Sequence, residues 1–265
     1  MYAFNYHRPS SLADAARLLS NASDGKFIAG GQTLLPTLKQ RLASPSDLID
    51  LNGIAELNGI KVSGSSVTVG AATRHAAVAS SAEIQKAIPT LAKLAGGIGD
   101  PQVRNMGTIG GSLANNDPAA DYPAAVLGLG ATVHTNKRKI AADDFFTGMF
   151  ETALEDGEII TTVEFPIPKR AGYVKFPNPA SRYVMVGAFV ADTGTGIRVA
   201  INGAAPCVFR HKEMEAALAK SFSPDALKGI RTDAGQMNND IHASAEYRAH
   251  LVGVMARRAV QAALG

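Results

Sequence analysis

The sequence predicts an α+β fold made of two parts. Along about the first 165 residues, short apolar strands alternate with helical stretches, and two glycine-rich segments interrupt them at 29–36 and 107–123. Past residue 169, successive strands are followed by helices, an order typical of an antiparallel sheet covered by helices. The proline-rich stretch 166–172 lies between them and stiffens a connection. We therefore expect a first domain over 1–168, with subdomains of about 1–55 and 56–168, and a smaller second domain over 169–265.

Composition and charge exclude several classes of protein. The 265 residues are 46% hydrophobic and 18% charged, as in ordinary globular proteins, and the net charge is +3. The only short basic run, 137–139, has no interleaved aromatics, so we expect no nucleic-acid partner. The N-terminus lacks the apolar core of a signal peptide, and the longest apolar run is about half of the ~20 residues that cross a bilayer. We expect a cytoplasmic chain with no transmembrane segment.

The cysteine content restricts the redox groups that this chain can hold. Cys207 is its one cysteine, which excludes an internal disulfide. It also excludes an iron–sulfur cluster ligated by cysteines of this chain alone. Any iron–sulfur relay must therefore belong to another chain.

In the first domain, a helix is followed by the order strand, loop, helix, strand. The opening helix, 10–22, has an apolar face and a serine that can cap its start. The first elements after it are a strand at 26–28, a helix at 34–42 and a strand at 47–51. A hairpin of 60–62 with 67–69 follows, and then a helix over 76–95 that is broken at Pro89. After a long loop, we expect a helix at 122–129 capped by Asp117 or Asp121, a hairpin of 131–135 with 138–141, and a strand at 158–165.

The second domain has a simpler expected order. Strands at 183–191, 196–202 and 206–209 are joined by glycine-rich turns. Helices at 211–221, 223–230 and 243–264 then close the chain.

Two glycine pairs, Gly30 with Gly31 and Gly110 with Gly111, predict a site for an anion. Glycine lets the backbone approach a ligand closely, and successive N–H groups in such a turn can point into one concavity. Hydroxyl groups lie beside both pairs, and helices are expected to follow them. Two such loops on one chain suggest a diphosphate held from both sides. The commonest use of a glycine pair is a plain turn, and neither loop matches the dinucleotide or P-loop fingerprint.

No residue cluster predicts metal binding or acid–base catalysis. Asp143 and Asp144 fit a solvated turn or cap, and no histidine accompanies the other carboxylates at ligand spacing. The six histidines are scattered, with no arrangement for nucleophilic catalysis. We therefore assign neither catalytic nor metal residues.

The glycine segments resemble a known family. AGGQTLLP at 29–36 and GDPQVRNMGTIGGSLANNDPAADYP at 99–123 closely resemble the two FAD-diphosphate loops of the FAD-binding medium subunit of molybdenum hydroxylases. That is the xanthine dehydrogenase family, and the aerobic carbon monoxide dehydrogenase type within it. Shorter matches, FNYHRP at 4–9, GEII at 157–160, KFPNPAS at 175–181 and YRAHL at 247–251, extend the resemblance over essentially the whole chain. The resemblance implies a PCMH/VAO-like FAD-binding domain followed by a CO-dehydrogenase-flavoprotein-like domain.

The resemblance also implies which residues hold FAD. Donors to the diphosphate come from both loops, Asp121 lies at the adenosine, apolar residues lie against adenine and flavin, and a lysine and a tyrosine lie near the cofactor. The implied set is Ala29, Gly30, Gly31, Gln32, Thr33, Leu34, Ile98, Thr108, Ile109, Gly110, Gly111, Ser112, Asp121, Ile160, Lys175 and Tyr183. Without the resemblance, Asp121 equally fits a helix cap and the isoleucines fit an ordinary core.

By the same resemblance, the chain is an electron-transfer subunit of an oxidoreductase. Its implied partners are a large subunit with a molybdenum–pterin cofactor and a small subunit with two [2Fe–2S] clusters, assembled as a dimer of heterotrimers that contacts the inner membrane, if at all, through those partners. Electrons would reach FAD here and leave to an external acceptor. Two alternatives stay open: a self-sufficient FAD-dependent oxidoreductase with its own small substrate, and a non-enzymatic partner without FAD. The substrate and the acceptor are not readable from this chain.

Overall fold

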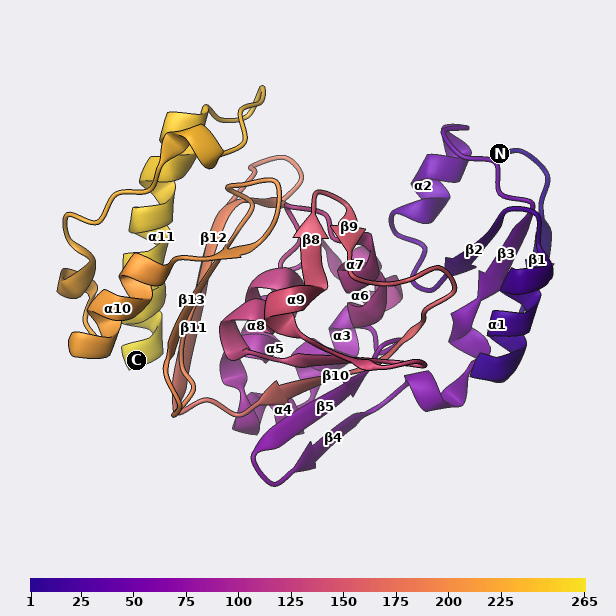
Figure 1. The fold of residues 1–265 in the computed structure, drawn as a ribbon, viewed down its shortest axis with the longest axis horizontal. Coiled ribbons are helices and arrows are strands. Elements are labelled where there is room, and N and C mark those ends of the chain that lie inside the picture. Colours follow the sequence, from indigo (N-terminus) through magenta and orange to yellow (C-terminus); the bar gives the residue numbers. More distant parts are fainter.

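The computed structural model describes residues 1–265 and confirms the α+β class (Figure 1). Three sheets carry the fold: a small N-terminal sheet, a five-stranded middle sheet and a four-stranded C-terminal sheet, with a short hairpin beside the middle one. No helix has both the length and the hydropathy needed to cross a membrane.

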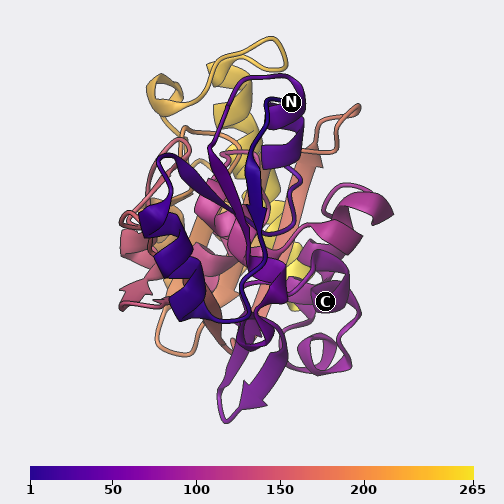
Figure 2. The same cartoon turned by 90° about the vertical axis from the view of Figure 1, so that its right-hand side faces the viewer.

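The N-terminal unit is a parallel sheet in the order β1-β3-β2 (Figure 2). It comprises β1 (Asn5–His7), α1 (Leu12–Asn21), β2 (Gly25–Ile28), α2 (Leu34–Lys39) and β3 (Asp47–Asp50), and the 3-10 turns Leu51–Gly53 and Ala55–Leu57 follow. Ser11 begins α1, because its side chain accepts a hydrogen bond from the N–H of Asp14. The apolar face of α1 packs on this sheet around Ala15 and Ile49, both fully buried.

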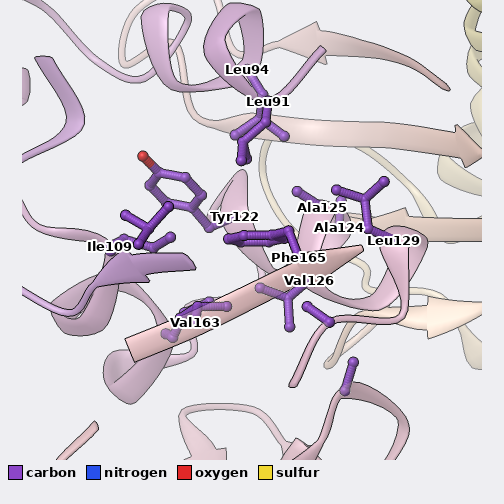
Figure 3. Packing of buried hydrophobic residues seen from close by; sticks show 14 of the residues in the cluster. Leu91, Leu94, Ile109, Tyr122, Ala124, Ala125, Val126, Leu129, Val163 and Phe165 are labelled. Carbon is purple, nitrogen blue, oxygen red and sulfur yellow. The ribbon is translucent and has the colours of Figure 1, made fainter. Parts of the chain in front are cut away.

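The middle unit is an antiparallel sheet in the order β4-β5-β10-β6-β7. Its strands are β4 (Ile60–Ser63), β5 (Ser66–Gly70), β6 (Thr132–Thr135), β7 (Lys139–Ala141) and β10 (Ile160–Pro166). Its helices are α3 (His75–Ser80), α4 (Ala82–Ala87), α5 (Pro89–Gly96), α6 (Pro101–Met106), α7 (Ile109–Asn115), α8 (Tyr122–Leu129) and α9 (Ala142–Phe145), with the hairpin of β8 (Phe146–Gly148) and β9 (Glu151–Thr152). Figure 3 shows their shared core, where Leu91, Tyr122 and Phe165 pack together.

The C-terminal sheet, in the order β11-β12-β13-β14, is covered on both faces. It contains β11 (Arg170–Pro177), β12 (Val184–Asp192), β13 (Ile197–Asn202) and β14 (Phe209–Arg210), followed by α10 (Lys212–Lys220), the 3-10 turns Pro224–Leu227 and Ala234–Gln236, and α11 (Ala245–Leu264). Along β12, Val186 and Val190 join the core under α11, whereas Phe189 joins the middle core at α8. Because both faces of β12 are buried, its sequence is a continuous apolar run and does not alternate between apolar and polar residues.

The structure corrects several sequence-based expectations. The long loop contains two short helices, α6 and α7, which Asp100 and Thr108 cap with their side chains. The helix over 76–95 is broken at Ser81 as well as at Pro89, because Ser81 starts α4 by capping it. The segment expected as a proline-rich connection forms β11 from Arg170 onward. The helix expected at 223–230 is a single 3-10 turn, and the strand expected from 158 begins at Ile160.

Candidate functional site

A large cleft of about 620 Å³ separates the N-terminal unit from the middle unit. The segment after β2 forms one wall, and the start of α7 with the residues before α6 forms another. The start of β10 and the loop between β11 and β12 close its ends. The volume is that of a site for a sizeable organic ligand, and both glycine pairs line it.

The first glycine loop presents a row of free N–H donors to this cleft. The backbone N–H groups of five consecutive residues, Gly30, Gly31, Gln32, Thr33 and Leu34, have no acceptor within the chain. All five residues line the cleft. Gly31 has a φ of +70°, a left-handed conformation that glycine adopts without strain. A concave row of unpaired donors with one left-handed residue is an anion-binding arrangement.

The second glycine loop uses most of its donors internally. The N–H groups of Ile109 and Gly110 donate to the carbonyl oxygens of Thr73 and Ala71 at 3.1 and 2.8 Å, and Gly111 donates to Thr108 Oγ1 at 3.2 Å. These three groups are therefore committed to the chain's own acceptors, contrary to the expectation that they donate to a ligand. The hydroxyl of Ser112 has no partner and lines the cleft. This loop contributes a hydroxyl and a close approach rather than a second row of N–H donors.

The two glycine loops approach each other closely along the cleft, and we call this meeting point the waist. A Cβ on Gly30 would lie 2.5 Å from the carbonyl oxygen of Met106 and 2.6 Å from the Cα of Gly107, so only glycine fits there. A Cβ on Gly111 would lie 3.9 Å from the Cβ of Ala29 on the opposite wall. Both loops therefore border the same part of the cleft.

Asp121 lies at the cleft in a buried hydrogen-bonded group. Its carboxylate accepts from the hydroxyl of Tyr173 at 2.8 Å and pairs with Lys175 Nζ at 2.9 Å. Asp121 occupies the N-cap position of α8, as expected, but its side chain makes no capping hydrogen bond to that helix. Burial raises the pKa of the Asp121 carboxyl, and the charge and hydrogen bond of Lys175 offset only part of that rise.

The remaining predicted residues are divided between the cleft and its surroundings. Ile98, Ile160 and Tyr183 line the cleft, and Tyr183 is 54% exposed. Ile109 is fully buried in the middle core and does not line the cleft. Lys175 lies behind the wall, where Nζ reaches Asp121 and also donates to the carbonyl oxygen of Gly97 at 2.9 Å.

Other cleft residues were not predicted from the sequence. Apolar and charged side chains from separate segments complete the walls: Phe27, Leu57, His75, Leu154, Glu158 and Arg182. Of these, only Glu158 lies in a segment with a family resemblance, GEII at 157–160, so the tertiary structure is what gathers the set. Burial would raise the pKa of Glu158, but hydrogen bonds, above all from Arg138, prevail and lower it to about 2. Burial, with the nearby Arg104 guanidinium, lowers the pKa of His75 to about 4.

Comparison with known proteins assigns the chain to a family. Residues 2–168 match the family model described as the FAD binding domain in molybdopterin dehydrogenase. Residues 178–263 match the CO dehydrogenase flavoprotein C-terminal domain. The chain belongs to the FAD-binding medium subunits of molybdenum hydroxylases. Between the two matched ranges lies β11, the strand that carries Lys175.

Curated relatives cover nearly the full length of this medium subunit. It is 35% identical to the carbon monoxide dehydrogenase medium chain of Hydrogenophaga pseudoflava over 98% of this chain and 96% of the relative. It is 37% identical to the nicotine 6-hydroxylase medium subunit of Paenarthrobacter nicotinovorans, over 97% and 96%. A solved carbon monoxide dehydrogenase from H. pseudoflava superposes with a TM-score of 0.89 at 36% identity, covering 98% of this chain and 97% of that one. The medium subunit is thus a component of an oxidoreductase.

The donor set of the cleft fits FAD. A dinucleotide carries a charged diphosphate between two flat ring systems, and the cleft offers unpaired N–H donors and a hydroxyl at its waist. On either side, apolar groups such as Ile98, Ile160 and Leu57 can cover rings.

Proposed function

We propose that this medium subunit binds FAD in the cleft between its N-terminal and middle units and transfers electrons through it. The electrons come from [2Fe–2S] clusters of an iron–sulfur partner, after substrate oxidation at a molybdenum–pterin cofactor in a large partner, and go to an external acceptor. The assembly would be a dimer of heterotrimers in the cytoplasm, meeting the inner membrane only through its partners. The family assignment and the single cysteine of this chain support this division of labour.

The observation that carries the proposal is the row of free donors at residues 30–34. Five adjacent N–H groups without an acceptor are unusual in a folded chain, because most backbone donors are paired. These residues line the cleft beside the other glycine loop, which adds the Ser112 hydroxyl. A diphosphate would satisfy several of them at once with charge-assisted hydrogen bonds, each roughly twice as strong as a neutral one.

The other cleft residues would orient the two ring systems. Ile98 and Ile160 would pack against the rings, and Asp121, positioned by Lys175 and Tyr173, would face the adenosine part. Tyr183 lies half-exposed at an end of the cleft, where an aromatic ring can control which acceptors reach the flavin. When bound, FAD supplies the redox chemistry, and this chain binds, orients and shields it.

An absorption spectrum tests the proposal. The purified chain, titrated with FAD, should show a flavin band at about one equivalent, and Gly111→Trp should remove it because the indole fills the waist. Gly196→Trp is the matched control, because no atom lies within 4 Å of the Cβ position at that glycine. If the wild-type chain never takes up FAD, even with its partner subunits present, the proposed function is wrong.

A further inference from the structure

An apolar turn projects from the middle unit between β8 and β9. Met149 and Phe150 form it, and the two residues are 50% and 57% exposed. Figure 1 shows the hairpin of β8 and β9 beside α7. Two adjacent large apolar side chains held into solvent mark an interaction site more often than isolated ones do. We call these two residues the docking turn.

The docking turn is fixed in a strained conformation. Phe150 has a φ of +56°, which is rare for a bulky residue because its Cβ crowds the following carbonyl. Asn116 fastens the turn at three points: its Nδ2 donates to the carbonyl oxygens of Gly148 at 2.8 Å and Glu151 at 2.7 Å, and its own carbonyl oxygen accepts from the N–H of Phe150 at 3.1 Å. Strain that the surrounding structure maintains at an exposed aromatic residue points to a binding role.

The docking turn is attached directly to the wall of the cofactor cleft. Asn115 and Asp117, the neighbours of Asn116 in the chain, both line the cleft. On the other side, the chain leaves β9 and reaches Leu154, which also lines it. A protein seated on the turn would therefore lie against the cleft wall.

We propose that the docking turn anchors the iron–sulfur partner that delivers electrons to the cleft. The inference rests on the proposed function. This chain has one cysteine, so its electron donor lies in another chain, and that donor must sit close to the cleft. The relatives are medium chains of multi-subunit enzymes, so such a chain is expected. An uncharged pair of Met and Phe suits the desolvated centre of a protein interface, where aromatic and Met side chains are enriched.

Site-specific crosslinking in the whole complex tests which chain covers the turn. The photo-crosslinker p-benzoylphenylalanine replaces Phe150 in the co-expressed, purified assembly of all three subunits, and mass spectrometry identifies the crosslinked peptide. We expect a crosslink to the iron–sulfur subunit. Val62 is the control position: it is 41% exposed and lies on β4, an edge strand of the middle sheet. A crosslinker at position 62 should give no crosslink to the iron–sulfur subunit. A crosslink from position 150 to the molybdenum subunit or to a second medium subunit, or none at all, overturns the proposal.

The substitution Phe150→Asn gives an independent test with two opposed readouts. Asparagine tolerates the left-handed backbone, so the Tm of the isolated chain should not fall and should rise by up to about 3 °C. Its Kd for the isolated iron–sulfur subunit should increase at least tenfold, while Val62→Asn leaves that Kd unchanged. An unchanged Kd for Phe150→Asn refutes the docking role. FAD uptake by both variants, measured by absorption, separates this result from a failure of the proposed function, because neither residue lines the cleft.

Discussion

Lys175 Nζ lies 2.9 Å from a carboxylate oxygen of Asp121, and this ion pair ties the C-terminal sheet to the cofactor cleft. Lys175 belongs to β11, whereas Asp121 immediately precedes α8 and lines the cleft. Both side chains are largely buried, at 14% and 6% exposure. The position of the cleft carboxylate therefore depends on a strand of the C-terminal sheet.

Replacing Lys175 with methionine should destabilise the chain. The variant leaves the Asp121 charge buried with only the Tyr173 hydroxyl as partner, and breaking a buried pair costs about 3 kcal/mol. Urea unfolding followed by circular dichroism measures this loss. Lys212→Met is the control: Lys212 is 67% exposed in its pair with Glu215, so its loss should cost less than about 1 kcal/mol. Equal effects of the two substitutions would contradict a special role for the buried pair.

Gly30→Ala should abolish FAD binding without unfolding the protein. The added methyl would lie 2.5 and 2.6 Å from backbone atoms of Met106 and Gly107, so the two loops must separate and the waist must change shape. We expect an FAD affinity at least 100-fold weaker, measured by quenching of flavin fluorescence. Gly196→Ala, whose methyl meets nothing within 4 Å, should bind FAD as the wild type does. Wild-type affinity in Gly30→Ala would show that the first loop does not hold the cofactor.

Elements with strong periodicity were predictable from the sequence. The helix expected at 10–22 is α1, and the strand expected at 183–191 is β12, shifted by one residue at each end. Their apolar faces are set by local spacing, so no tertiary information is needed. The helices α6 and α7 were missed because they have only six and seven residues, and α7 has two glycines in its first turn. Side-chain caps and packing on neighbouring elements stabilise them, which spacing does not report.

The lining residues of the cleft were predictable where they belong to contiguous sequence motifs. Of the residues implied by the resemblance, all but Ile109 and Lys175 line it. A motif places Ile109 beside Gly110, but helical geometry turns its side chain into the core. The prolines near 166–168 hid β11, because proline suggests the end of a strand and not its start. As an edge strand, β11 accommodates Pro177 at its end.

Acidification should destabilise the chain as pH falls from about 6.5 to about 4. Burial lowers the pKa of His75 from 6.5 to about 4, so the imidazole stays neutral in the folded chain while the unfolded chain takes up a proton. The unfolded state then binds more protons than the folded state, so the free energy of unfolding falls by about 3 kcal/mol by pH 4. Urea unfolding at a series of pH values measures it. In His75→Gln, the free energy of unfolding should change less with pH over this range than in the wild type. An identical dependence on pH would assign the effect to other groups.

Ser112→Ala should weaken FAD binding and leave the stability of the cofactor-free chain unchanged. The Ser112 hydroxyl has no partner within the chain and lines the cleft beside the waist, so its removal breaks no internal hydrogen bond. A hydrogen bond to a charged phosphate contributes about 1.5–3 kcal/mol, so the affinity should fall about tenfold or more.

Thr108→Ala should behave differently, because Thr108 Oγ1 caps α7 and its loss costs about 1 kcal/mol of stability. Titration calorimetry and urea unfolding on both variants separate the two roles. Loss of stability without loss of affinity in Ser112→Ala would show that this hydroxyl serves the fold and not the cofactor.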